Sequence, residues 1–365
     1  MTLADSVSAI LHSPLSRARP FETFVEPVKT VACEFGLYNT EEEEGRGSIC
    51  TTWLGHAGFL LQLPRSTKEE RPTRIIFDPI FAERASPSAW FGPRRYLPTP
   101  CKVNELPSVD YIVISHNHYD HLDIECLKQI HRQCPEVQFL VALGVKSFLM
   151  EELTAQELQI HELDWWETVS FPMALRSKVE FVCTPAQHNS GRGITDQRKT
   201  LWASWVVRQF LASQPETPSA SIYFAGDTGY STSSGPCPAF KEIGNKYGPF
   251  DLAMIPIWRG ASLSILGRLG FRLTPGATET LLSTLHASPS DAVELAEDVK
   301  AKHSIAMHFG TFCGSDDEAR EPLVLLAEAL LKKGKKWTKK APCKEGDFGV
   351  INVGETVFIP TTPRS

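Results

Sequence analysis

Three histidines and one aspartate lie within six consecutive positions of the chain, directly after a short apolar run. The run ends at Ile114, and the cluster consists of His116, His118, Asp120 and His121. Imidazole and carboxylate groups are the ligands that Zn²⁺ and similar divalent cations favour. Four such groups held together without a cation would be costly to bury. The cluster therefore predicts a metal site rather than an ordinary polar loop.

The elements that must position this cluster flank it on both sides. Residues 111–114 are apolar and predict a strand, and residues 122–134 predict a helix, because apolar residues recur there at three- and four-residue spacing. Alternate residues of an extended segment can converge on one ion only if the backbone turns sharply. We therefore expect the ligands to occupy a turn from strand to helix.

Further residues that could bind metal follow other predicted strands. They are His188, Asp227 and His308, and each stands at the C-terminal end of a short apolar run. Loops converge at such strand ends, and sites are usually built there. Singly, each could be a satisfied core histidine or a capping aspartate. Together with the first cluster they favour a site for two metal ions, which needs about six protein ligands.

Longer strings around these positions resemble a known family. They are TWLGHA at 52–57, DPIF at 78–81, RASPS at 84–88, ELDWWE at 162–167, FAGDTGY at 224–230, GPFDLA at 248–253 and HFGTF at 308–312. In this order they resemble the N-acyl-phosphatidylethanolamine-hydrolysing phospholipase D family of the metallo-β-lactamase superfamily. The resemblance extends over roughly residues 50 to 335.

The resemblance implies an α/β (α+β) fold, a four-layer αββα metallo-β-lactamase sandwich. Residues 48–360 would form one hydrolase domain, and a chain of 365 residues with 42% hydrophobic content can bury such a core. Residues 1–47 would be an N-terminal extension. Its middle, with the acidic run 41–44, would be solvated, and residues 3–11 could pack on the body.

The resemblance also implies the ligand sets and the reaction. One ion would be held by His116, His118 and His188, the other by Asp120, His121 and His308, with Asp227 as the bridge. Two Zn²⁺ are expected because histidine dominates, although Fe or Mn would accept the same ligands. A hydroxide held by both ions would attack phosphorus in line. The family reaction releases an N-acylethanolamine and leaves phosphatidic acid.

Three more residues are interpreted from the same strings. Asp78 matches a family aspartate expected to orient a metal-binding histidine, although a turn residue before Pro79 would need no such role. His286 aligns with a family histidine near the reacting phosphate, where it could polarise the phosphoryl group or protonate the leaving oxygen. It could equally be a plain helix-entry residue. Asp120 and His286 are thus the candidate catalytic residues, and His56 is expected to be a buried, hydrogen-bonded strand histidine.

Two segments could contact a membrane. Residues 258–285 replace a shorter family connection and mix large apolar residues with arginines, so they could form a lid or a lipid-facing surface. They could also be a helix and loop packed in the core. Residues 332–340 place six lysines around Trp337 and could approach an anionic surface, or could be a solvated helix end.

Composition narrows the partners and the compartment. A net charge of −6 argues against a nucleic-acid partner, which would call for a basic face. The apolar runs are too short to span a bilayer, and the N-terminus lacks secretory signal features. Nine scattered cysteines without a CxxC pair suit a reducing compartment. We expect an intracellular protein, cytoplasmic or peripheral on an internal membrane, with a phospholipid substrate and a family tendency toward homodimers.

Three hypotheses remain open from the sequence. The favoured one is a dinuclear phospholipase D-type phosphodiesterase. The second is a thioesterase, lactonase or phosphodiesterase of the same fold with a small soluble substrate, motivated by the altered segment 258–285. The third is a non-catalytic lipid or metal binder, which is disfavoured because no expected ligand is missing.

Overall fold

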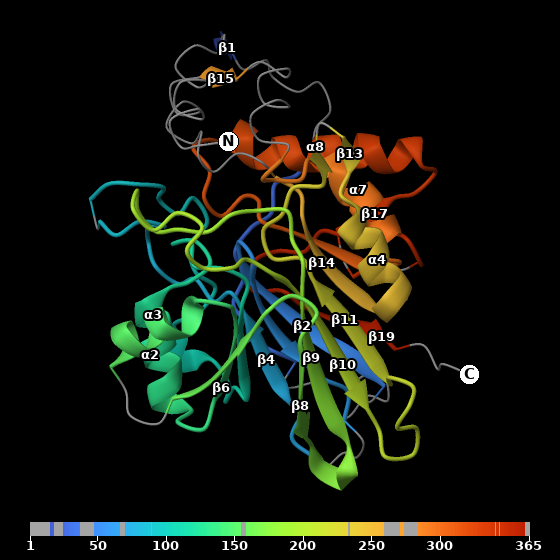
Figure 1. Cartoon of the computed structure of the whole chain (residues 1–365). Coiled ribbons are helices and arrows are strands. Elements are labelled where there is room, and N and C mark those ends of the chain that lie inside the picture. The colour runs from blue at the N-terminus through green and yellow to red at the C-terminus, as the bar shows by residue number, and fades with distance from the viewer. Residues whose placement is uncertain are drawn as a thin grey trace.

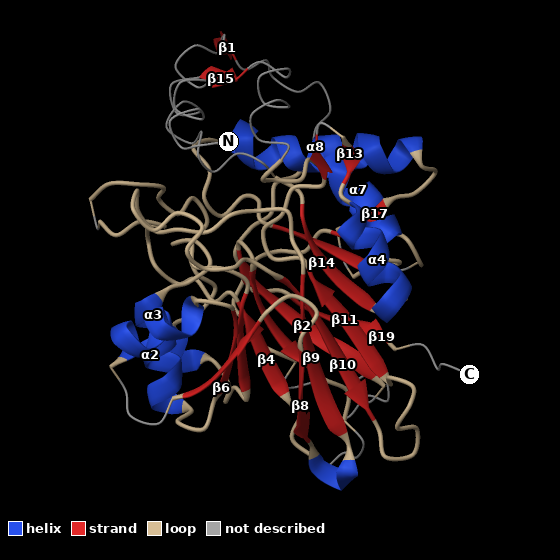
Figure 2. Ribbon diagram, viewed as in Figure 1, coloured by secondary structure: helices blue, strands red, loops and turns tan. Residues whose placement is uncertain are grey.

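The computed structural model describes residues 15–17, 25–36, 47–65, 70–88, 90–154, 158–232, 234–258, 271–273, 284–339, 341–342 and 344–361. Two large sheets pack against each other within these ranges, and helices cover the outer face of each sheet (Figures 1 and 2). The αββα sandwich expected from the sequence is confirmed.

The first sheet has seven strands in the order β19-β2-β3-β4-β5-β6-β7. Their bounds are β2 (Ser48–Gly55), β3 (Gly58–Gln62), β4 (Arg74–Phe77), β5 (Tyr111–Ile114), β6 (Gln138–Ala142), β7 (Gln159–Leu163) and β19 (Thr356–Pro360). The four strands from β4 to β7 are parallel. Their C-terminal ends therefore share one edge. The outer face carries α2 (Ile124–Gln133) and α3 (Val145–Leu153).

The second sheet has eight strands in the order β17-β18-β16-β14-β11-β10-β9-β8. Their bounds are β8 (Thr168–Pro172), β9 (Lys178–Thr184), β10 (Ser204–Phe210), β11 (Ala220–Phe224), β14 (Leu252–Pro256), β16 (Ser304–Met307), β17 (Trp337–Thr338) and β18 (Phe348–Gly349). The helices on this side are α4 (Pro238–Tyr247), α7 (Pro289–Asp298) and α8 (Asp316–Lys332). Short 3-10 turns η2 (Val103–Glu105) and η3 (Ala174–Arg176) and the hairpin β12 (Ser231–Thr232) and β13 (Gly235–Pro236) complete the elements.

Strand β4 illustrates why these residues form a sandwich. Ile75 and Phe77 belong to the core cluster that contains residues of both sheets, whereas Ile76 belongs to the cluster under α2 and α3. Side chains alternate between the two faces of a strand. A strand that is apolar at consecutive positions is therefore buried on both faces, as a layer between helices and a second sheet requires.

Part of the predicted N-terminal extension packs on the body. Val28 and Phe35 are buried, and Thr30 forms a bridge with Val353. A three-residue strand, β1 (Leu15–Arg17), pairs with β15 (Phe271–Leu273). Residues 3–11 and 41–44, and most of segment 258–285, lie outside the described residues. The domain boundary after residue 47 stays a prediction.

Candidate metal centre

The predicted ligands converge from four separate segments at one edge of the sandwich. The segments are the turn after β5 and the ends of β9, β11 and β16. Nine histidine and aspartate residues offer nitrogen or oxygen atoms within 4.8 Å of one another in overlapping groups. They are His56, His116, His118, Asp120, His121, His188, Asp227, His286 and His308. All seven predicted ligands are among them.

A carboxylate ends the ligand-bearing turn and begins the helix behind it. Asp123 is the N-cap of α2 and accepts a hydrogen bond from the Cys126 N–H at 3.1 Å. Its other oxygen accepts from the N–H groups of Phe81 and Ala82, at 3.0 and 2.8 Å. Capping satisfies a helix N-H that would otherwise lack a partner. The helix predicted over 122–134 therefore begins at Ile124.

Three histidines form the first group. His118 Nδ1 lies 2.9 Å from His116 Nε2 and 3.3 Å from His188 Nε2. The far nitrogen of His188, Nδ1, lies 2.8 Å from the Leu285 carbonyl oxygen. Because a carbonyl can only accept, His188 Nδ1 carries the proton and Nε2 presents a lone pair to the group. Such an outer partner fixes the tautomer of a metal-binding histidine.

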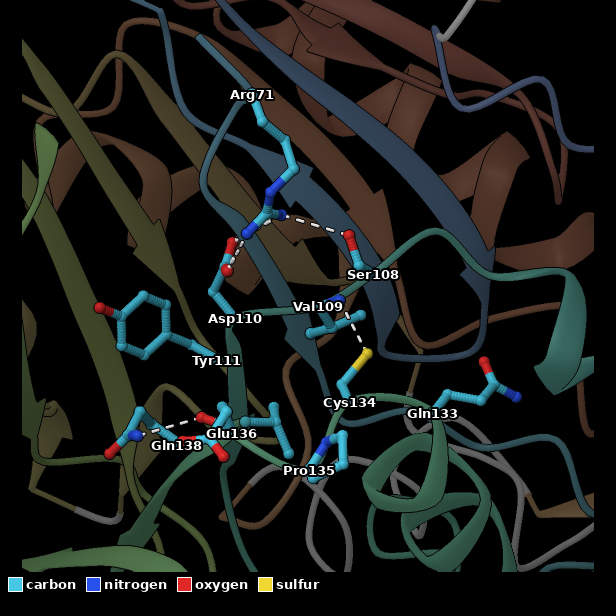
Figure 3. A pocket seen from close by; sticks show the side chains of 11 residues that line it. Arg71, Ser108, Val109, Asp110, Tyr111, Gln133, Cys134, Pro135, Glu136 and Gln138 are labelled. Atoms are coloured by element: carbon cyan, nitrogen blue, oxygen red, sulfur yellow. Dashed lines mark hydrogen bonds and ion pairs between the residues drawn. The ribbon is translucent and has the colours of Figure 1, made fainter.

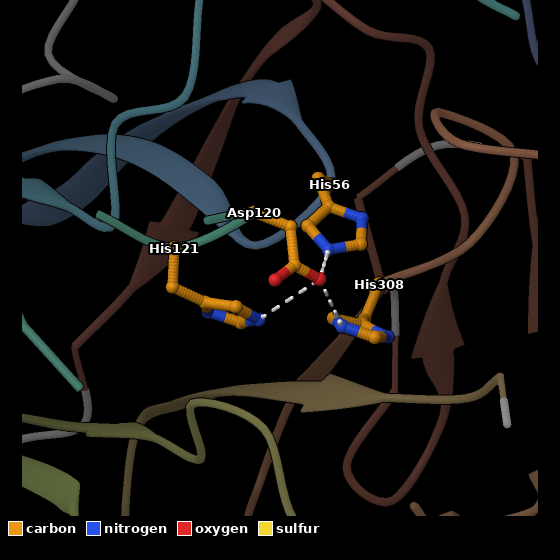
Figure 4. Close-up of side chains that lie close together, drawn as sticks. All are labelled: His56, Asp120, His121 and His308. Carbon is orange, nitrogen blue, oxygen red and sulfur yellow. Dashed lines mark hydrogen bonds and ion pairs between the residues drawn. The ribbon is translucent and has the colours of Figure 1, made fainter. Parts of the chain in front are cut away.

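The second group contains Asp120, His121 and His308. Asp120 Oδ2 lies 3.8 Å from Nε2 of both histidines (Figure 4). Behind the group, Asp78 Oδ2 lies 2.7 Å from His121 Nδ1, and Asp78 Oδ1 accepts from the Ser115 N–H at 2.8 Å. Asp78 is fully buried. It is therefore placed to orient His121 rather than to occupy an exposed turn.

Asp227 lies between the two groups. Its Oδ2 atom is 3.3 Å from both His188 Nε2 and His308 Nε2. The close approach depends on Gly226, whose φ is +61°. A Cβ at this position would lie 2.7 Å from Ser115 Cβ and 2.9 Å from the Ala203 carbonyl. Glycine alone fits there, so it permits the end of β11 to approach the end of β5.

The donor set fits metal ions. His121 Nε2 and both ring nitrogens of His308 are buried and have no hydrogen-bond partner within the described residues. Buried polar atoms are normally hydrogen-bonded, and such exceptions are explained when the atoms bind a partner such as an ion. The nitrogens of His116 and His118 face each other at 2.9 Å. Imidazole and carboxylate groups that converge in this way suit Zn²⁺, Fe or Mn.

Burial keeps most of the imidazoles neutral. It lowers the pKa of His188 to about 3 and that of His118 to about 4. His121 differs, because the carboxylates of Asp120, Asp78 and Asp227 outweigh its burial and raise its pKa to about 9. Neutral imidazole is the form that binds metal. Most of the site is thus ready for an ion at neutral pH.

His286 and His56 occupy contrasting positions. His286 is partly exposed, and its Nδ1 lies 3.1 Å from Asp227 Oδ1. Burial disfavours its charged form, but Asp227 raises its pKa. His56 is buried, as expected, but it lies in the turn between β2 and β3 rather than in a strand. Its Nε2 atom is 2.9 Å from Asp120 Oδ2.

Sequence reasoning predicted Asp78 but missed two other outer partners of the site. Ser115 donates its hydroxyl to Asp78, so its oxygen accepts from His116 Nδ1 at 2.9 Å. Ser115 stands directly before the ligand cluster, which was an available signal. The Leu285 carbonyl carried no such signal, because a backbone atom is independent of residue type.

Comparisons with known proteins agree with this geometry. A model of the β-lactamase superfamily domain matches residues 73–309. A *Caenorhabditis elegans* protein named N-acyl-phosphatidylethanolamine-hydrolyzing phospholipase D 1 is 32% identical over 86% of this chain and 77% of its own length. The chain belongs to this phospholipase D family of the metallo-β-lactamase superfamily. The chain is therefore a metal-dependent hydrolase.

A yeast protein and a solved structure are also similar to this chain. A *Saccharomyces cerevisiae* protein with the same family name, described as mitochondrial, is 29% identical over 79% of this chain, which spans 54% of that protein. A solved structure of a possible metal-dependent hydrolase from *Veillonella parvula* has a TM-score of 0.53 at 16% identity, covering 85% of this chain and 99% of that one. That likeness concerns the fold alone.

In this family member the metal centre opens at one side. His118, Asp120 and His286 are partly exposed, whereas the remaining residues of the two groups are buried. A separate pocket of about 360 Å³ lies at the opposite strand ends, where Arg71 pairs with Asp110 (Figure 3). That pocket contains none of the predicted ligands. Among the described residues, the candidate metal centre is thus open on the side of His118, Asp120 and His286.

Three lysines of segment 332–340 form ion pairs with glutamates in the described residues. Lys333 lies 2.7 Å from Glu294 and 3.0 Å from Glu297, and Lys335 lies 2.8 Å from Glu297. Lys339 pairs with Glu26. None of the helices in the described ranges is both long and apolar enough to cross a bilayer. Membrane contact through 332–340 or 258–285 stays a prediction, as does a homodimer.

Proposed function

We propose that this chain hydrolyses N-acyl-phosphatidylethanolamine to an N-acylethanolamine and phosphatidic acid, with water attacking phosphorus. The observation that carries the proposal is the combination of the two ligand groups with the 32% identity to the *C. elegans* protein of that name. The seven ligands would be His116, His118 and His188 for one ion, Asp120, His121 and His308 for the other, and Asp227 between them. Zn²⁺ is the proposed metal.

Two divalent ions at these groups would polarise the phosphoryl oxygen and activate water at neutral pH. The protein's own contribution is to hold the donors in place. Ser115 and the Leu285 carbonyl fix His116 and His188 by their Nδ1 atoms, at 2.9 and 2.8 Å. Asp78 does the same for His121 at 2.7 Å. Such outer partners keep the ligands in productive orientation.

His286 is the candidate general acid. Its Nδ1 faces Asp227, and the imidazole is partly exposed at the open side of the site. Asp227 favours the protonated form of His286. A proton held there could pass to the oxygen of the leaving N-acylethanolamine, which would otherwise depart as an alkoxide.

The test is to supply N-acyl-phosphatidylethanolamine in mixed micelles, in H₂¹⁸O, with and without chelator, and to identify products by mass spectrometry. We expect chelator-sensitive release of N-acylethanolamine, with the ¹⁸O in phosphatidic acid. Asp227→Asn should abolish this, and His161→Gln, at a partly buried histidine in β7, should not. Release of free fatty acid would contradict attack on phosphorus, and no product from metal-loaded protein would favour the soluble-substrate hydrolase instead.

A further inference from the structure

Large apolar side chains are exposed at the tips of two loops. Trp90 and Phe91 are 82% and 77% exposed, and Ile194 is 82% exposed. Trp90 and Phe91 lie between β4 and β5, and Ile194 lies between β9 and β10. Scattered apolar residues are common on surfaces. These three side chains, however, are more than three-quarters exposed and are gathered on two loop tips. Packing in the protein core does not account for them.

Both loops are anchored to the turn that carries the ligand cluster. The first loop is held by Asp123, which accepts from the N–H groups of Phe81 and Ala82 at 3.0 and 2.8 Å. The second is held by Asn117, which accepts from the Gly191 N–H through Oδ1 at 2.7 Å. The apolar tips are therefore tied to the segment from Asn117 to Asp123, which carries metal ligands and the cap of α2.

Arg192 strengthens the second anchor. Its guanidinium donates to the carbonyls of Asn117 and Leu122, both at 3.0 Å, and lies 3.8 Å from the centre of the Tyr119 ring. A cation over an aromatic face is attracted by the ring. In Figure 1 both loops extend at the end of the molecule where β5 and β9 finish. The tips thus project on the side of the metal centre.

The two loops are basic in an acidic protein. Residues 83–95 and 190–199 contain six arginines and lysines against two acidic residues, a net charge of +4, whereas the whole chain carries −6. Arg94, Arg198 and Lys199 are exposed, and Arg84 and Arg192 are partly exposed. Arg95 is buried and donates to the Ala82 and Ile80 carbonyls, and Arg94 pairs with Glu83 at 2.7 Å. A basic surface with an exposed tryptophan and phenylalanine has the chemistry of an anionic lipid interface, where aromatic rings insert and cations stay near the head groups.

We propose that loops 83–95 and 190–199 form a docking rim that inserts Trp90, Phe91 and Ile194 into the surface of an anionic phospholipid bilayer. The docking rim is distinct from segments 258–285 and 332–340. It deepens the proposed function, because a lipid substrate would then reach the metal centre from the bilayer on which the rim rests. A protein partner would require a contiguous apolar patch, whereas separate tips suit insertion between lipids.

The first experiment measures sedimentation of the metal-loaded full chain with vesicles that contain no N-acylated lipid. The vesicles are either phosphatidylcholine alone or phosphatidylcholine with 30% phosphatidylserine. We expect binding to the anionic vesicles, weakened by high salt. The variants Trp90→Ser, Phe91→Ser and Ile194→Ser, made singly, should each weaken binding about three- to tenfold. The three substitutions lie on two different loops. If one variant fails to fold, the other two still test the proposal.

The matched control is Leu175→Ser in η3, because Leu175 is 61% exposed and lies at the opposite end of β9. Its binding should equal that of the native chain. Equal binding by all three rim variants, or no vesicle binding by the native chain, overturns the proposal. The proposal is also overturned if vesicle binding is lost only when lysines of 332–340 are substituted, because the membrane contact then belongs to that segment. Vesicle binding by a metal-loaded chain that releases no N-acylethanolamine in the mixed-micelle assay would retain the docking rim and refute the proposed substrate.

Discussion

The imidazole of His56 lies 2.9 Å from the carboxylate of Asp120, measured from Nε2 to Oδ2. The same residue joins the two sheets through its backbone, because its carbonyl accepts from the His308 N–H at 3.0 Å and its N–H donates to Thr311 at 2.6 Å. One residue of the β2–β3 turn therefore fixes both the backbone beside His308 and the side chain of Asp120.

We predict that His56→Asn weakens metal binding at the second group by about 10- to 100-fold, the usual cost of losing an outer partner. His56 has a φ of +53°, and asparagine tolerates this conformation, so the backbone should be retained while the short amide leaves Asp120 without its partner. Metal content should fall from two ions toward one on dialysis against a weak chelator. His161→Gln is the control, and two tightly held ions in His56→Asn would contradict the prediction.

Removal of the Asp78 charge should affect His121. In Asp78→Asn the side chain loses one acceptor oxygen, while Ser115 and His121 still require acceptors at 2.8 and 2.7 Å. We expect a 10- to 100-fold lower metal affinity and a loss of about 1–3 kcal/mol in the free energy of unfolding. Isothermal calorimetry and chemical unfolding measure these two effects. Full affinity would show that Asp78 is only a turn residue.

His286→Gln should separate catalysis from metal binding. His286 contacts Asp227 through Nδ1 at 3.1 Å and remains partly exposed. If His286 supplies the proton to the leaving oxygen, kcat should fall by about 10²- to 10⁴-fold, with two ions still bound. Substrates with a more acidic leaving group should be less affected, because they need less protonation. An equal loss for all leaving groups would argue for a structural role.

The chelated protein should lose stability as the pH falls from 7 to 5. Burial lowers the pKa of His56 and of His188 to about 3, so both stay neutral in the folded state while the unfolded chain takes up protons below about pH 6.5. Each would cost about 2 kcal/mol at pH 5. His121 has the opposite effect, because its pKa is raised to about 9 in the folded state. It adds less than about 1 kcal/mol of folding stability over this pH range. Chemical unfolding of the chelated protein at several pH values measures this change in the free energy of unfolding. Stability that rises toward pH 5 would contradict the prediction.

The candidate metal ligands could be predicted because histidine and aspartate are residue types that bind metal ions. His116 to His121 form one contiguous turn, and the other candidates each end an apolar run, so position marked them as candidates, whereas their division into two ligand sets came from the family resemblance. The same holds for α2, whose apolar spacing and Asp123 cap are local features. Local interactions decide such elements, and they need no knowledge of the rest of the chain.

Only the tertiary structure decided how these pieces meet. Asp227 reaches both ligand groups because Gly226 lets β11 approach Ser115, which is distant in sequence. The roles of His56 and of the Leu285 carbonyl arise from contacts across the two sheets. Composition drew attention to the lysines of 332–340, three of which the fold pairs with glutamates, and passed over Trp90, which the fold exposes. Exposure and long-range contact are properties of packing, and residue type alone does not determine them.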